Sequence, residues 1–240
     1  MSSPKKRDWN RLKRLGRYLI GRPNWIQLFA WQTNPGQLTA YVDSDWAGEK
    51  DERKSVSGGA IMVGDHMIRT WSKDQEIRAL SSAEAELYAA CLGGCQAKGV
   101  RSIAADMGID FEILMKIDAS AAIGIIQRKG LGKVRHIEVK DLWLQDEVRE
   151  SRIVIEKIPG VENPADMGTK GLSKGDTDKH VQNLRCYYEQ EPDMLYSILL
   201  SDPLPTLSTY GHQEAEDPST VGGCKMYPML PNCVTLPDSN

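Results

Sequence analysis

Four acidic residues occupy positions from which carboxylates could do chemistry. Asp43 ends the apolar, β-favouring run Leu38–Val42, and Asp118 ends a second run of this kind. Glu86 falls in the second turn of a predicted helix, and Asp166 falls in the first turn of another. A buried carboxylate without a partner tends to take up a proton, so an Asp at the end of a core strand needs a partner.

These four acids would form a metal site if the fold brings them together. If the strands that end at Asp43 and Asp118 are neighbours, both carboxylates emerge at one edge of the sheet. Converging carboxylates repel one another, and divalent cations relieve that repulsion. Oxygen ligands suit Mg²⁺ or Mn²⁺ better than zinc, and two such ions about 4 Å apart can promote phosphodiester cleavage. The alternative is four unrelated surface acids among the 33 Asp and Glu residues, and spacing alone favours that alternative.

Regular hydrophobic patterns predict the elements that would position these acids. Three strands are predicted between residues 37 and 73, with a tight turn at Gly64–Asp65. A long helix is predicted at 81–107, opened by the capping-box spacing of Ser81 and Glu84. Beyond it we predict a strand at 112–118, helices at 119–127 and 139–150, a strand at 152–158, and a last helix opened by Asn163 and Pro164. This order predicts an α/β (mixed α+β) protein with a mixed sheet flanked by helices.

The two ends of the chain differ from the middle in charge. Residues 1–22 hold eight Lys and Arg against Asp8 alone, and residues 173–240 hold ten acids against four bases. Trp9, Leu12 and Leu19 recur at helical spacing, which predicts an amphipathic helix whose basic face is either solvated or in contact with phosphates. The acidic tail holds seven of the twelve prolines and is predicted to be largely disordered, with at most one segment docked on the fold.

Two observations concern the cellular compartment. No apolar run approaches 18 residues and no secretory signal is recognisable, so we expect no membrane span. The five cysteines show no paired spacing, which is typical of a reducing compartment. We therefore expect an intracellular protein, cytoplasmic or nuclear.

Five segments carry a resemblance to a known family: Tyr41–Gly48, Ala79–Tyr88, Lys116–Ile123, Arg135–Glu138 and Asn163–Lys170. In this order they resemble the ribonuclease H domain of copia-type (LTR) retrotransposon polyproteins. The amphipathic helix around residues 9–21 resembles the end of the reverse transcriptase part of the same polyproteins. The resemblance implies three parts: the end of the reverse transcriptase or connection segment at 1–35, a ribonuclease H-like domain at 36–172, and a tail outside the resemblance at 173–240.

The resemblance also implies a fold, an activity and a set of ligands. The fold is a ribonuclease H-like, five-stranded mixed sheet with helices on both sides. The activity is that of a ribonuclease H, a metal-dependent endonuclease that cuts the RNA strand of RNA/DNA hybrids during reverse transcription. Asp43, Glu86, Asp118 and Asp166 match the metal-binding acids of the family, which implies two Mg²⁺ ions, with Mn²⁺ as an alternative. The implied partners are the hybrid and the reverse transcriptase part of a polyprotein, with no membrane.

Several positions add to this resemblance or depart from it. Ser44 and Ser82 fall where related enzymes contact the 2′-hydroxyl and backbone of RNA, although Ser82 could equally cap the long helix. The loop before Asp166 lacks the His of cellular and retroviral relatives, as in other copia-type members, and the candidate substitute, His136, lies before a different helix. Gly168 inside the last helix is expected to be mildly destabilising.

A second function class stays open beside the enzyme. The chain could be a catalytically silent retrotransposon remnant that acts at most as a nucleic-acid-binding module. The presence of all four acids favours the enzyme, because a decaying remnant would be expected to lose one of them.

Overall fold

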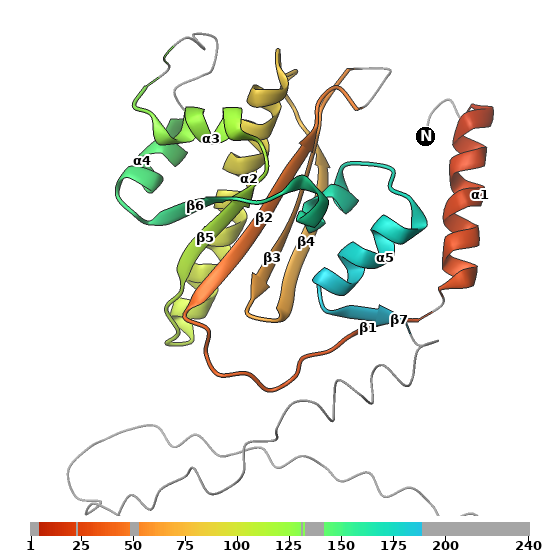
Figure 1. Ribbon diagram of the computed structural model, residues 1–240, viewed down its shortest axis with the longest axis horizontal. Coiled ribbons are helices and arrows are strands. Elements are labelled where there is room, and N and C mark those ends of the chain that lie inside the picture. The colour runs from red at the N-terminus through yellow and green to blue at the C-terminus, as the bar shows by residue number, and fades with distance from the viewer. Residues whose placement is uncertain (1–4, 23, 49–52, 131, 133–141, 189–240) are drawn as a thin grey trace, which may run out of the picture. The chain divides into compact units, whose positions relative to one another are not determined.

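A five-stranded mixed sheet forms the centre of the computed structural model, which describes residues 5–22, 24–48, 53–130, 132 and 142–188 (Figure 1). The strand order is β4 (His66–Asp74), β3 (Val56–Val63), β2 (Gln37–Asp45), β5 (Glu112–Ile117) and β6 (Ile153–Lys157). β2, β3 and β4 pair antiparallel, whereas β2, β5 and β6 run parallel. The predicted five-stranded mixed sheet is confirmed, and each predicted strand is present.

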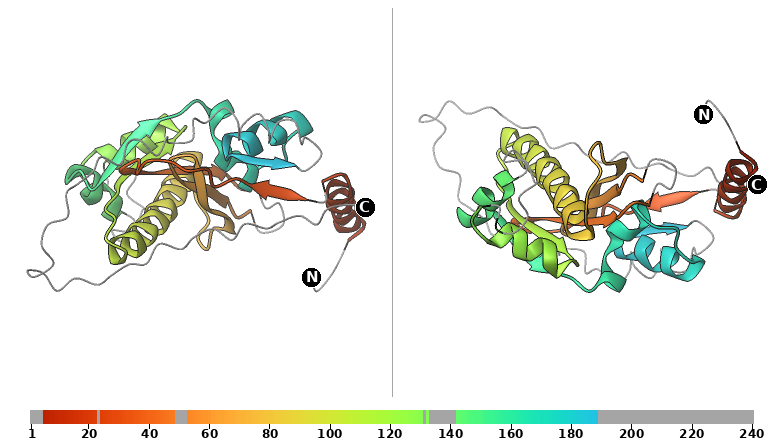
Figure 2. Two further views of the ribbon diagram at one scale, coloured as in Figure 1. Left: turned by 90° about the horizontal axis from the view of Figure 1, so that it is seen from below. Right: turned by 90° about the horizontal axis from the view of Figure 1, so that it is seen from above.

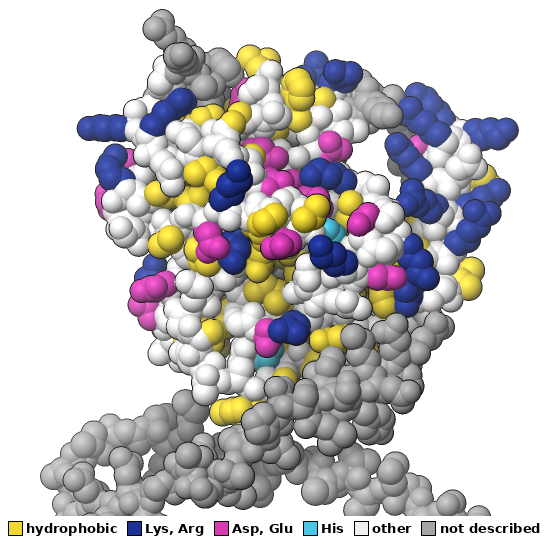
Figure 3. Space-filling model, viewed as in Figure 1, with side chains coloured by type: hydrophobic (Ala, Val, Ile, Leu, Met, Phe, Trp, Pro, Cys, Tyr) yellow, Lys and Arg dark blue, Asp and Glu magenta, His cyan; other side chains and the backbone are white. Residues whose placement is uncertain are grey.

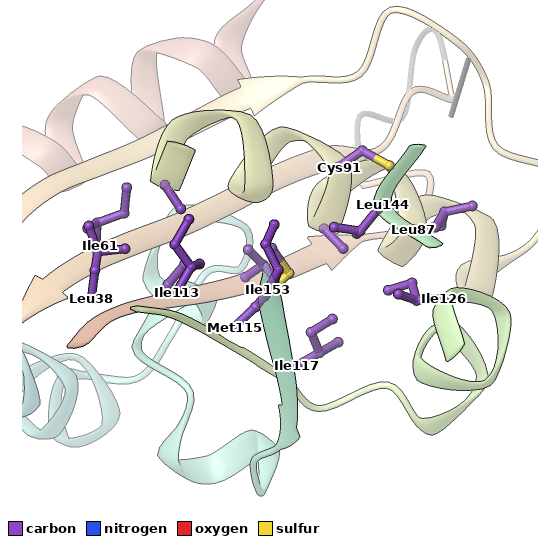
Figure 4. Close-up of a cluster of buried hydrophobic side chains, with 14 of the residues drawn as sticks. Leu38, Ile61, Leu87, Cys91, Ile113, Met115, Ile117, Ile126, Leu144 and Ile153 are labelled. Carbon is purple, nitrogen blue, oxygen red and sulfur yellow. The ribbon is translucent and has the colours of Figure 1, made fainter. Parts of the chain in front are cut away.

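One face of the sheet carries the main hydrophobic core. It is covered by α2 (Ser82–Asp106), α3 (Ser120–Gln127) and α4 (Trp143–Arg149). Alternate β2 residues point to this face, as expected for a strand, and they pack with Leu87, Ile126 and Leu144 (Figure 4). α2 lies close to β2 because Gly93 has no side chain: a Cβ there would lie 2.3 Å from Cγ1 of Val42.

The opposite face of the sheet is covered by shorter elements (Figure 2). These are the 3₁₀ helices η2 (Gly160–Glu162) and η3 (Pro164–Gly168), followed by α5 (Lys174–Asn183). The last predicted helix is therefore only a 3₁₀ helix, because Asn163 caps a turn that ends at Gly168. A second cluster of buried residues fills this side: Ala60, Met62, Val181, Leu184, Cys186 and Tyr188.

This second cluster corrects the predicted start of the disordered tail. Residues 173–188 form α5 and β7 (Cys186–Tyr188), and Leu184, Cys186 and Tyr188 are buried. This stretch is ordered because a few apolar side chains reach the sheet, so the predicted boundary at residue 173 lies too early in the chain. Residues 189–240 lie outside the described residues, so the rest of the tail stays a prediction.

The N-terminal segment adds a helix and a short strand beside this second face. α1 (Lys6–Gly21) confirms the predicted helix, and none of its residues is buried. β1 (Trp25–Gln27) pairs antiparallel with β7, which forms a separate two-stranded sheet. The following linker is held by Gln32, whose side-chain amide donates to the Val63 carbonyl at 2.8 Å. Among the described residues, no helix has the length and apolar character needed to cross a bilayer.

Candidate metal centre

Three carboxylates converge where β2, β5 and the start of α2 meet. Asp43 lies near the end of β2, Asp118 directly follows β5, and Glu86 lies in the second turn of α2. Each contributes an oxygen to a group in which all such atoms lie within 4.8 Å of one another. Asp43 is 1% exposed and Glu86 8%, while Asp118 is half-buried. The fold thus gathers three of the four predicted acids at one point.

Sheet register explains why two of these acids meet. Tyr41 of β2 lies opposite Lys116 of β5 in the parallel ladder. Asp43 and Asp118 each come two residues later, so both side chains leave their strands on the same face and at the same level. Two strand ends that are distant in sequence therefore converge.

The cap of α2 explains why Glu86 rather than Glu84 faces the acids. The Ser81 hydroxyl accepts the Glu84 backbone N–H at 3.2 Å, and the Glu84 carboxylate accepts from the Leu80 N–H at 2.7 Å and the Tyr88 hydroxyl at 2.8 Å. The hydrogen bonds of Glu84 therefore lie at the start of the helix and not at the other acids. Oε1 of Glu86 instead accepts the Ser44 N–H at 3.3 Å, at the end of β2.

Asp166, the fourth predicted acid, is linked to this group through Lys170. The Lys170 ammonium lies 2.9 Å from Oδ1 of Asp166 and 3.1 Å from Oδ1 of Asp43. The Thr169 hydroxyl donates to the other oxygen of Asp43. Asp166 is not a member of the three-carboxylate group itself. The sequence prediction assigned no role to Lys170, although its i,i+4 spacing from Asp166 indicates an ion pair on a helical turn.

Asn163 fixes the turn that carries Asp166 against the sheet. It is fully buried, its amide nitrogen donates to the Val42 carbonyl at 2.9 Å, and its amide oxygen accepts the Ala165 N–H at 3.2 Å. Val42 lies beyond the last β5 pair, and this amide ties the end of β2 to the turn that carries Asp166. Asn163 was predicted only as a helix cap, and its contact with β2 makes it a positioning residue as well.

Gly168 was expected to weaken the last helix, and the structure gives it a packing role. A Cβ at this position would lie 2.9 Å from the Trp71 carbonyl and 3.2 Å from Cα of Gly58. η3 therefore rests directly on the backbones of β3 and β4, and a side chain at Gly168 would push Asp166 away from the sheet edge.

Burial raises the pKa values of all three carboxyl groups, and the charges of nearby acids add to the effect. Burial raises the pKa of Glu86 to about 8, with further contributions from the charges of Asp43 and Asp118. Burial raises the pKa of Asp43 to about 6, although Thr169 and Lys170 act in the opposite direction. The pKa of Asp118 is also raised, first by burial. At neutral pH this group therefore resists holding three negative charges.

The donor set fits a divalent cation. Oε2 of Glu86 is buried and has no hydrogen-bond partner among the described residues. Lys170 provides positive charge to Asp43 and Asp166, whereas the described residues offer Glu86 no ammonium or guanidinium contact. A cation held by Asp43, Glu86 and Asp118 would satisfy the open oxygen and offset the repulsion. The carboxylate cluster could thus hold a metal ion, and an all-oxygen site suits Mg²⁺ or Mn²⁺.

Three further predicted positions have different surroundings. Ser44 is buried beside Glu86, and Ser82 is exposed at the first turn of α2. Ser81 supplies the cap, so Ser82 is not required for it. Contact of Ser44 or Ser82 with RNA stays a prediction. His136 lies outside the described residues.

No family model matches the chain, but related proteins are found by sequence. It is 31% identical over 172 residues to the retrovirus-related Pol polyprotein from transposon TNT 1-94 of Nicotiana tabacum. It is 28% identical over 177 residues to those from transposons RE2 and RE1 of Arabidopsis thaliana. Homologues of this chain are retrovirus-related Pol polyproteins of plant copia-type transposons. These matches cover 71–72% of the chain but 12–13% of the polyproteins, so the chain spans about an eighth of their length.

Solved structures similar to this chain include ribonuclease H domains. LC11-RNase H1, isolated from compost, matches 55% of this chain and 92% of its own, with 17% identity and a TM-score of 0.39. The N-terminal ribonuclease H domain of a Mycobacterium tuberculosis protein matches 61% of this chain and 96% of its own length, with 19% identity and a TM-score of 0.37.

Proposed function

We propose that this chain is a ribonuclease H, a metal-dependent endonuclease that cuts the RNA strand of RNA/DNA hybrids during retrotransposon reverse transcription. The observation that carries the proposal is the group of three converging carboxylates, with one buried Glu86 oxygen that has no partner. Homology to Pol polyproteins of retrotransposons supports it. The proposed partners are the hybrid and the reverse transcriptase part of a polyprotein, and the proposed location is intracellular.

In this proposal Asp43, Glu86, Asp118 and Asp166 hold two Mg²⁺ ions. When bound, such ions supply Lewis-acid catalysis at the oxygens of a phosphodiester. The chain's own residues set the geometry: the parallel register aligns Asp43 with Asp118, and the cap of α2 leaves Glu86 free to join them. Ser82, exposed near these acids on the first turn of α2, and Ser44 are the proposed contacts to the RNA strand.

Cleavage of a labelled RNA/DNA hybrid tests the proposal. We expect the full chain with Mg²⁺ to cut the RNA strand of the hybrid and to leave DNA/DNA and RNA/RNA duplexes intact. Asp118→Asn should abolish cleavage, because it removes a carboxylate from the group and keeps the side-chain volume. Asp45→Asn is the matched control, since Asp45 ends the same strand as Asp43 but is outside the group. Cleavage by Asp118→Asn would refute the proposed site, and an inactive parent chain would favour the silent remnant.

A further inference from the structure

α1 is attached to the folded domain by specific contacts that involve its second half. The Tyr18 and Tyr188 hydroxyls are 2.7 Å apart, and a guanidinium nitrogen of Arg22 lies 3.1 Å and 3.2 Å from the two carboxylate oxygens of Asp178. The Arg22 guanidinium also lies over the ring of Tyr188, 4.0 Å from its centroid. Arg14 donates to the Leu172 carbonyl at 3.2 Å. α1 therefore has a defined place beside α5.

A basic crevice of about 400 Å³ lies between these two helices. We call it the α1–α5 crevice, and its lining includes four cationic side chains: Arg14, Arg17, Arg22 and Lys174. Asp178 is the only acid in the lining, and Arg22 already pairs with it. The ion pairs found among the described residues leave Arg14, Arg17 and Lys174 without an acidic partner. The crevice thus carries an excess of positive charge around a space large enough for a phosphate group.

Only a short stretch of chain separates the crevice from the residues that contact the carboxylates. Leu172, which lines it, is two residues from Lys170, which contacts Asp43 and Asp166. Two residues span at most about 7 Å, a distance that a nucleic-acid strand covers in a few nucleotides. Figure 3 shows Lys and Arg side chains along α1 on the same face of the molecule as several Asp and Glu side chains.

We propose that the α1–α5 crevice binds a backbone phosphate of the nucleic acid, a few nucleotides from the bond that is cut. This inference rests on the proposed function and deepens it by adding a second contact with the same substrate. Basic side chains that neutralise phosphates release condensed counterions, so binding through them weakens steeply as salt rises. A fixed phosphate contact also sets the position of the duplex relative to the acids.

Arg17 and Lys174 are the residues to change. Both are exposed, and no hydrogen bond or ion pair holds either of them to the protein among the described residues, so their replacement leaves the attachment of α1 intact. The double variant Arg17→Gln/Lys174→Gln removes two charges and keeps long side chains. Arg11→Gln is the matched control: Arg11 lies on the same helix but pairs with Asp8 at 3.6 Å and does not line the crevice.

The experiment measures hybrid binding by fluorescence anisotropy across a salt series, with Asp118→Asn as the background to prevent cleavage. The double variant should lower the slope of log affinity against log salt by about one, as expected for the loss of one phosphate contact, whereas Arg11→Gln should change it less. Circular dichroism melting checks that every variant is folded. An unchanged slope in the double variant, or a change equal to that of Arg11→Gln, would overturn the proposal.

Separate readouts distinguish this proposal from the proposed function. If the parent chain fails to cut hybrid but the double variant still lowers the salt slope, the crevice binds nucleic acid and only the nuclease assignment fails. If the parent cuts hybrid and the slope is unchanged, only the crevice proposal fails. Vesicles with anionic phospholipids provide the competing source of phosphate. Loss of vesicle binding in the double variant, with hybrid binding unchanged, would also overturn the proposal.

Discussion

Glu86 is expected to make the stability of the metal-free protein depend on pH. In the unfolded chain its carboxyl loses a proton near the ordinary pKa of 4.5, whereas burial raises the folded-state pKa to about 8. Between these values the folded state binds more protons than the unfolded state. The free energy of unfolding therefore falls as pH rises from about 4.5 to about 8, by up to about 1.4 kcal/mol per pH unit.

Replacing Glu86 with Gln removes this ionisation and nearly preserves the side-chain volume. The pKa difference corresponds to about 5 kcal/mol at 1.36 kcal/mol per unit, and the buried Gln amide retains a desolvation cost of its own. We therefore expect metal-free Glu86→Gln to be more stable than the parent by about 2–4 kcal/mol at pH 9 and equally stable at pH 4. The pKa of Asp43 is also raised, to about 6, so this residue makes the free energy of unfolding fall with rising pH in both proteins.

Guanidinium denaturation followed by tryptophan fluorescence, in EDTA at pH 4, 7 and 9, measures this difference. Glu112→Gln is the control, because Glu112 is exposed at the opposite end of β5 from the carboxylate group. Added Mg²⁺ at 100 times its Kd should stabilise the parent by about 2.7 kcal/mol and Glu86→Gln by less. Parallel pH profiles of the parent and Glu86→Gln would refute the buried, charge-repelled position of Glu86.

Three further predictions concern the supports of the site. Asn163→Ala should lower the free energy of unfolding by about 1–3 kcal/mol, because the buried Val42 carbonyl loses its donor; an unchanged urea midpoint would contradict this. Lys170→Met should lower the metal-free Tm at pH 8, since two carboxylates lose their ammonium partner, and Mg²⁺ should raise the Tm of this variant more than that of the parent. Gly93→Ala should cost about 1–3 kcal/mol in unfolding free energy through its clash with Val42, whereas Gly99→Ala, which meets nothing within 4 Å, should be neutral or stabilising in the same thermal melts.

The sheet could be predicted from sequence because its strands carry strong local signals. The hairpin of β3 and β4 has a tight turn with Gly64 at a φ of +57°, and α2 begins at the predicted cap. The convergence of Asp43 and Asp118 followed from two strand ends and one assumption, that the strands are neighbours. The parallel pairing of β2 with β5 confirms that assumption.

The elements on the second face could not be predicted because their sequence patterns are weak or because they depend on residues far away in the sequence. β1 and β7 have three residues each, too few for a periodic pattern, and α5 buries only His180 and Val181. The role of Lys170 depends on Asp43, which lies 127 residues earlier in the chain. Local sequence cannot reveal such a contact until the sheet is known to bring η3 onto the end of β2.

The pairing of β1 with β7 has a mechanical consequence. Trp25 lies opposite Tyr188 and Gln27 opposite Cys186, so residues 25 and 188 lie side by side at one end of this small sheet. Tension applied at residues 25 and 188 would separate these three pairs one after another, beginning with Trp25 and Tyr188, before the load reached the five-stranded sheet.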